Sequence, residues 1–202
     1  MYHKHHTKGI VVSSRAEGDS NKLVNVFTEN FGLINAKVQG ARNLHSKLRG
    51  GCQDFSLGEF SLIHGKTGWK VVSSRSEKNL FEVFKNSPEK LKMVGNILNL
   101  VKKLVSEESY ISLATTKLEA KSGVFNIVCN FFNFLEKAKS QDIVLAECLT
   151  LLRILHVLGY MRHDPELSVP ISSSEITIES LEAISPKRSR MIALINESLK
   201  AN

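Results

Sequence analysis

The sequence of 202 residues has few of the residues that build disulfide frameworks and metal sites. Its three cysteines, Cys52, Cys129 and Cys148, are far apart and form no CxxC pair. This pattern predicts neither a disulfide framework nor a zinc site, and it is typical of a reducing cytosol. The motifs GxxxxGK(S/T), GxSxG and HExxH, which mark common phosphate-binding and hydrolytic sites, are absent. We therefore expect that the chain is not an enzyme.

Long apolar runs are also absent. The longest stretch, residues 143–158, is interrupted by Glu147 and Arg153 among others, so it is too short and too polar to span a bilayer. Residues 1–6 lack the apolar run that follows the start of a signal peptide. We expect a cytoplasmic protein.

The composition is that of an ordinary globular protein, but its charge is unevenly distributed. Hydrophobic residues make up 42% and charged residues 23%, so a packed core is expected rather than disorder. Residues 1–80 contain 12 Lys and Arg against 6 Asp and Glu, whereas residues 81–202 contain 15 against 14. This asymmetry indicates that the first part meets a polyanion. A basic surface without a partner is the alternative reading.

The first 80 residues contain short alternating runs separated by glycine-rich breaks. Strands are predicted at residues 7–14, 22–29, 33–39, 56–64 and 69–74. Ile10 and Val12 are expected on one face of the first strand. Five short strands within about 75 residues suit the OB-fold, a five-stranded barrel that binds oligonucleotides. We therefore assign residues 1–79 to an OB-fold nucleic-acid-binding domain.

After residue 80 the hydrophobic period becomes helical. Helices are predicted from Ser87-Pro88 onward, near residues 123–139, at about residues 142–158 and from Ser185-Pro186, with a loop at residues 162–176. In the last helix, Ile192, Ile195 and Leu199 are expected to face inward. Residues 80–202 are thus predicted to form a helical, partner-binding domain. The fold class is α+β, an N-terminal five-stranded OB-fold barrel followed by an all-α domain.

The segment from Gly40 to Gly51, between the third and fourth strands, is the strongest candidate for DNA binding. It contains Arg42, Lys47 and Arg49 and no acidic residue. Glycines border it on both sides, so we expect it to be mobile. Several mobile cations suit a phosphate chain, because they displace its condensed counterions.

A second candidate lies around the turn between the last two predicted strands. Trp69 is flanked by Lys66 and Lys70, and single-strand binders stack bases on aromatic rings beside cations. We therefore add these three residues to the predicted DNA-binding set. The alternative for Trp69 is packing in the barrel core.

Arg153 stands in an otherwise apolar helix. A buried guanidinium needs an anionic partner, which is either an internal carboxylate or an acidic peptide of another protein. The histidines at positions 3, 5 and 6 are interpreted as part of a frayed chain end rather than as a metal site.

Several short motifs match the pattern of one family. They are Gly9-Ile10-Val11-Val12, Gly18-Asp19, Phe27-Thr28, Gln39-Gly40-Ala41-Arg42, Gly50-Gly51 and Leu158-Gly159-Tyr160. Together they resemble the DNA repair protein RecO family, most specifically over residues 9–60. The resemblance implies an OB-fold followed by a helical domain, without catalytic turnover.

The resemblance also implies partners. RecO proteins bind single-stranded and duplex DNA, anneal complementary strands, and work with RecR to load RecA onto strands coated by single-stranded-DNA-binding protein (SSB). The helical domain would then bind the acidic tail of SSB, with Arg153 as the residue that faces it. Many family members have a four-cysteine zinc module after Leu-Gly-Tyr, but no cysteine follows Tyr160 here. We expect no zinc. The alternative function is an OB-fold adaptor that binds RNA or the ribosome and recruits a protein through its helices.

Overall fold

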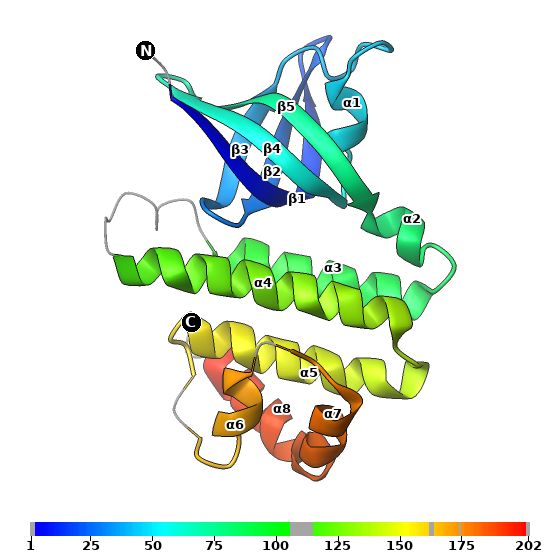
Figure 1. Cartoon of the computed structure of the whole chain (residues 1–202), viewed down its shortest axis with the longest axis vertical. Coiled ribbons are helices and arrows are strands. Elements are labelled where there is room, and N and C mark those ends of the chain that lie inside the picture. Colours follow the sequence, from blue (N-terminus) through cyan, green and yellow to red (C-terminus); the bar gives the residue numbers. More distant parts are fainter. Residues whose placement is uncertain (1–2, 106–114, 162–163, 174, 201–202) are drawn as a thin grey trace.

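The computed structural model describes residues 3–105, 115–161, 164–173 and 175–200. It confirms the predicted fold class, because a closed five-stranded barrel at one end is followed by helices stacked beneath it (Figure 1). The strands are β1 (Lys4–Glu17), β2 (Asn21–Thr28), β3 (Gly32–Val38), β4 (Ser56–Gly65) and β5 (Gly68–Asn79), with helix α1 (Leu48–Gly51) between β3 and β4.

The barrel closes in the order β1-β2-β3-β5-β4. All neighbouring strands are antiparallel except β3 and β5, which pair in parallel and close the barrel. Val11, Val24 and Ile34 are fully buried in the barrel core. Ile10 and Val12 lie on the opposite face of β1, as predicted, where they join the core of the helical part.

Two strands are longer than predicted. β1 begins at Lys4, so His5 and His6 belong to a strand paired with β4, and the predicted frayed end is wrong at these two residues. β5 extends to Asn79, where it still pairs with Ser56 of β4. The end of β5 is mostly polar and exposed, so no alternation in the sequence marked it.

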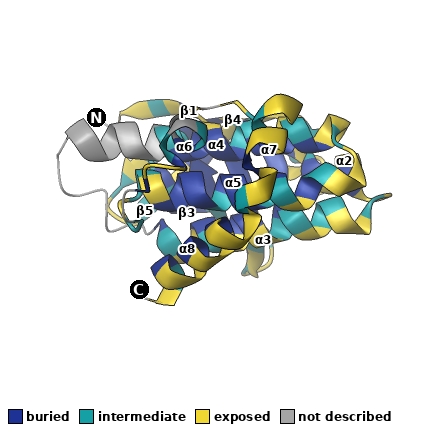
Figure 2. Cartoon of the chain, turned by 90° about the horizontal axis from the view of Figure 1, so that it is seen from below, coloured by how far each residue is buried: buried dark blue, intermediate teal, exposed yellow. Residues whose placement is uncertain are grey.

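The helical part contains α2 (Leu80–Phe84), α3 (Pro88–Leu104), α4 (Thr115–Lys137), α5 (Ser140–Val157), α6 (Ser168–Ser172), α7 (Ile178–Ile184), a 3₁₀ turn (Ser185–Lys187) and α8 (Arg188–Lys200). Helix α5 is its buried centre, with other helices around it (Figure 2). Among the described helices, none is long and apolar enough to cross a membrane.

The transition from barrel to helices occurs at Asn79. Its side-chain Oδ1 accepts hydrogen bonds from the backbone N–H groups of Phe81 (3.0 Å) and Glu82 (3.3 Å), which caps α2 directly after β5. The barrel then packs on the helices through one continuous core, where the rings of Phe27 and Phe125 lie 5.4 Å apart. The division into domains 1–79 and 80–202 stays a prediction, because the two parts share this core.

The end of the chain differs most from the prediction. The expected loop at residues 162–176 contains the short helix α6. Ser185-Pro186 begins the 3₁₀ turn, and the additional helix α7 precedes it, capped by the Thr177 side chain. Ile192, which was expected to face inward, is 39% exposed. Met191 and Leu194 are buried instead, and Ile195 is buried as predicted, so the buried face includes Met191 in place of Ile192.

Candidate nucleic-acid interface

The segment that leads from β3 to α1 is anchored to the β1–β2 turn. Gly40 has a φ of 65°, and its N–H donates to Asn21 Oδ1 (3.0 Å). The Arg42 N–H donates to Ser20 O (2.9 Å), and its guanidinium Nη1 donates to Gly18 O (2.8 Å). The expected mobile loop is therefore replaced by a defined path that is fixed by hydrogen bonds at its first residues.

The other end of this segment is packed on the barrel. Cys52 is fully buried, and its Sγ lies 3.6 Å from Ser74 Oγ of β5. A Cβ atom at Gly51 would collide with the Ser74 side chain, so only glycine allows this close approach. The segment from Gly40 to Gly51 is thus held at both ends, and we call it the anchored segment. Figure 1 shows its middle part at the end of the barrel that points away from the helices.

The predicted cations on this segment are open to solvent. Arg42, Lys47 and Arg49 are exposed, and among the described residues no carboxylate lies within ion-pair distance of any of them. Leu44, at the tip between them, is 79% exposed. The arrangement leaves three positive charges available to neutralise phosphates.

Lys66 and Lys70 form a second group on the β4–β5 hairpin. Lys66 lies in the turn and Lys70 on the outer face of β5, and both are exposed. Lys70 pairs across the strands with Lys37 of β3. Lys37 in turn pairs with Leu23 of β2.

This register reveals cations that the sequence reasoning missed. Leu23 pairs with Arg15 of β1, so Lys70, Lys37 and Arg15 lie in one row across four neighbouring strands. Lys37 also pairs with Glu17, whose Oε2 is 2.8 Å from the Lys37 Nζ. We call these three cations the barrel row. The sequence gives no sign that positions 15, 37 and 70 are neighbours, because only the strand order and register bring them together.

The structure places Trp69 in the barrel core rather than on an open surface. Its side chain is 8% exposed and packs against the rings of His5, Phe31 and His64, with centroid distances of 5.7, 5.0 and 4.8 Å. A ring in this position has no free face for a base. A DNA-binding role for Trp69 therefore has no support in the geometry, and the packing alternative matches it.

Arg153 is buried, as its apolar surroundings predicted. It is 1% exposed, and both its Nε (3.0 Å) and its Nη2 (2.8 Å) donate to Pro170 O. The Nη2 group also donates to Glu175 O (3.0 Å). Burial lowers the pKa of the guanidinium to about 10, so it stays charged at neutral pH. Its position holds the chain around α6 and does not face an external peptide.

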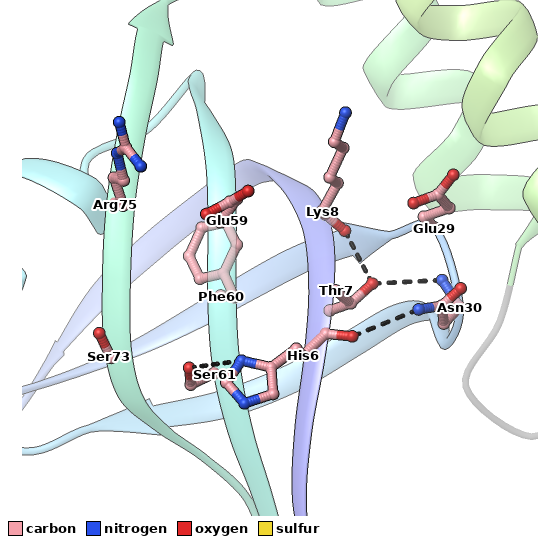
Figure 3. A pocket seen from close by; sticks show the side chains of 10 residues that line it. All are labelled: His6, Thr7, Lys8, Glu29, Asn30, Glu59, Phe60, Ser61, Ser73 and Arg75. Atoms are coloured by element: carbon pink, nitrogen blue, oxygen red, sulfur yellow. Dashed lines mark hydrogen bonds between the residues drawn. The ribbon is translucent and has the colours of Figure 1, made fainter.

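One pocket lies on the outer face of β1, β4 and β5 and has mixed charge. Its volume is about 530 Å³, and Figure 3 shows its lining, in which His6 Nδ1 lies 3.1 Å from Ser61 Oγ. Lys8 and Arg75 stand on either side of Glu59, and Glu29 lines the rim. Two carboxylates offset two cations, so this pocket has little attraction for a polyanion.

The thiols do not supply a reactive nucleophile. Burial raises the pKa of Cys52, Cys129 and Cys148, and that of Cys129 to about 12. A thiolate is the reactive form of cysteine, and little of it forms at neutral pH when the pKa is raised. In the described part of the chain, no group of three His, Cys, Asp or Glu side chains is placed to hold a metal ion.

Comparison with known proteins finds relatives, most clearly for the barrel. Residues 1–76 match the family model described as "Recombination protein O N terminal". The DNA repair protein RecO of Alkaliphilus metalliredigens is 26% identical over 176 residues, which cover 86% of this chain and 65% of that protein. The chain is thus similar to RecO proteins, through a family model over its barrel and through weaker identity over most of its length.

Other RecO proteins show the same relation. That of Acetivibrio thermocellus is 24% identical over 76% of this chain and 57% of its own length. That of Synechocystis is 42% identical, but over 67 residues, which are 33% of this chain and 25% of that protein. The chain thus spans about three fifths of the length of the first two RecO proteins.

Proposed function

We propose that the chain is a recombination mediator in bacterial DNA repair, associated with the nucleoid. It binds single-stranded DNA, anneals complementary strands and, with RecR, helps to load RecA onto SSB-coated DNA. The observation that carries the proposal is the anchored segment of a RecO-type barrel, which presents Arg42, Lys47 and Arg49 without a neighbouring carboxylate among the described residues.

The proposed mechanism is electrostatic. The exposed cations neutralise phosphates and release counterions, which holds a strand on the protein without reading its sequence. Two strands held in this way repel each other less, so that complementary bases can search for register. No step breaks or forms a covalent bond, and we propose that the chain works without catalytic turnover and without zinc.

The helical part is proposed to recruit the acidic tail of SSB. Because Arg153 is buried and donates to the main chain, the tail would have to contact exposed groups of the helices. The geometry favours a structural role for Arg153 over the predicted contact.

Annealing of complementary SSB-coated oligonucleotides, measured by fluorescence energy transfer with and without the chain, tests the proposal. We expect the chain to accelerate annealing, and the R42A/K47A/R49A variant to lose most of this acceleration. An unaltered annealing rate on adding the chain would contradict the proposal. Stronger binding to RNA than to DNA of equal length would favour the alternative, an adaptor for RNA or the ribosome.

A further inference from the structure

A second pocket lies where the last turn of α3 meets the outer face of β1, β2 and β3. Its volume is about 280 Å³, and we call it the seam pocket. It is lined by Ser13, Ser14, Arg15, Leu23, Asn25, Asn35 and Lys102. It therefore combines side chains of the barrel with one side chain of the helical part.

A β-bulge arranges the barrel side of the seam pocket. The pairing of β1 with β2 shifts between Val11 and Ser13, which places Ser13 opposite Asn25. The Asn25 Nδ2 donates to Ser13 Oγ (3.0 Å) and so holds the amide at the pocket wall. Asn35 is the partner of Asn25 on β3, which gives two neighbouring amides with donor and acceptor atoms.

Packing of α3 on the barrel positions the wall of the seam pocket that the helix forms. Val101 and Val105, on either side of Lys102, are buried in the core that α3 shares with Val12 of β1. Lys102 itself is exposed and lines the pocket. The shared core therefore keeps α3 beside β1, so that Lys102 and Arg15 line the same cavity.

The charge of the seam pocket differs from that of the pocket in Figure 3. The lining of the seam pocket contains two cations and no carboxylate. In the pocket of Figure 3, by contrast, two glutamates offset Lys8 and Arg75. The nearest acid along β1, Glu17, is neutralised by Lys37. A net positive, hydrogen-bonding cavity suits an anionic ligand with polar edges.

We propose that the seam pocket binds one nucleotide of single-stranded DNA. A phosphate lies between Arg15 and Lys102, and a base edge meets the amides of Asn25 and Asn35. This inference rests on the proposed function and extends its site from the barrel to α3.

Lys102 and its neighbour Lys103 provide a matched test. Both are exposed lysines in the last turn of α3, but only Lys102 lines the pocket. Binding of fluorescent oligothymidylate is measured by anisotropy over a series of salt concentrations. We expect Lys102→Ala to reduce the salt slope, the change in log affinity per log salt, by about 0.7, the value for one single-strand phosphate contact. Lys103→Ala should leave the slope close to that of the unchanged chain.

A double variant tests whether Arg15 and Lys102 hold the same phosphate. If both side chains hold one phosphate, either single substitution already breaks that contact. The fold-loss of affinity in R15A/K102A is then smaller than the product of the fold-losses in the two single variants. Losses that multiply, or equal effects of Lys102→Ala and Lys103→Ala, would overturn the inference and leave the proposed function standing. Failure of the unchanged chain to bind oligothymidylate would overturn both. Thermal unfolding of each variant verifies that the fold is intact.

Discussion

Two regions of the molecule, the anchored segment of the barrel and the centre of α5, use an arginine in opposite ways. Arg42 lies on the surface, and its guanidinium donates a hydrogen bond to a neighbouring turn while its charge stays open to solvent. Arg153 is 1% exposed and donates hydrogen bonds to the main-chain carbonyls of Pro170 and Glu175. The first can attract a polyanion, whereas the second stabilises the chain around α6.

The difference follows from what surrounds each arginine in the sequence. Arg42 stands in a polar segment without an apolar stripe, so nothing buries it. Arg153 stands between leucines and isoleucines of a helix that is apolar on most sides, so burial of its neighbours takes it into the core. Substitutions in the two regions should accordingly affect stability in one and DNA binding in the other.

The largest effect on stability is expected at Trp69, which the sequence assigned to DNA binding and the structure places in the core. Trp69→Ala should lower the free energy of unfolding by about 4 kcal/mol, because it removes a large side chain from a packed barrel. Urea unfolding measures this loss. In the unchanged chain, the fluorescence of this single tryptophan should stay constant when oligothymidylate binds. Strong quenching would show that the ring reaches a base and would contradict the core assignment.

The next largest effect is expected at Arg153. Arg153→Ala should lower the free energy of unfolding by about 3 kcal/mol, because the carbonyl oxygens of Pro170 and Glu175 lose a donor and a cavity remains in place of a fully buried side chain. Arg188→Ala, at an exposed position on α8, is the matched control and should change it by less than about 0.5 kcal/mol. Equal losses in the two variants would show that the hydrogen bonds and burial of Arg153 contribute little to stability.

The smallest effect is expected at Glu17, the acid that pairs with the barrel row. Glu17→Gln should change stability by about 0.5 kcal/mol or less, because both side chains of this ion pair are more than a third exposed. It should strengthen single-stranded DNA binding by about twofold, since Lys37 becomes available to phosphate. Glu77→Gln, an equal charge change on an exposed residue of β5, is the control. If both variants gained the same affinity for single-stranded DNA, the effect would come from net charge alone and not from the release of Lys37.

The barrel was predictable from the sequence because its signal is local. Alternation in β1 separates Ile10 and Val12 from Val11, and the structure places them on the two faces that this pattern indicates. Helices α3 and α5 were predictable for the same reason, since their apolar stripes repeat at helical spacing. The chain around α6 was not, because prolines and serines at 165–174 are typical of a loop and do not exclude a five-residue helix.

The candidate site was predictable only where its residues are neighbours in sequence. Arg42, Lys47 and Arg49 form a visible cluster, but the row of Arg15, Lys37 and Lys70 depends on strand order and register. The seam pocket depends further on where α3 meets the barrel. The internal partners of Arg153 likewise come from a distant segment, so the sequence indicated its burial without indicating which groups hold it.

The salt dependence of single-stranded DNA binding tests the central claim most directly. The R42A/K47A/R49A variant removes three exposed cations from the anchored segment, and K92A/K139A/K200A removes three exposed cations from the helical part as a control. If the segment grips phosphates, the first variant lowers the salt slope by about two, and the control leaves it nearly unchanged. A slope of the first variant equal to that of the unchanged chain would show that DNA binds elsewhere and would contradict the account.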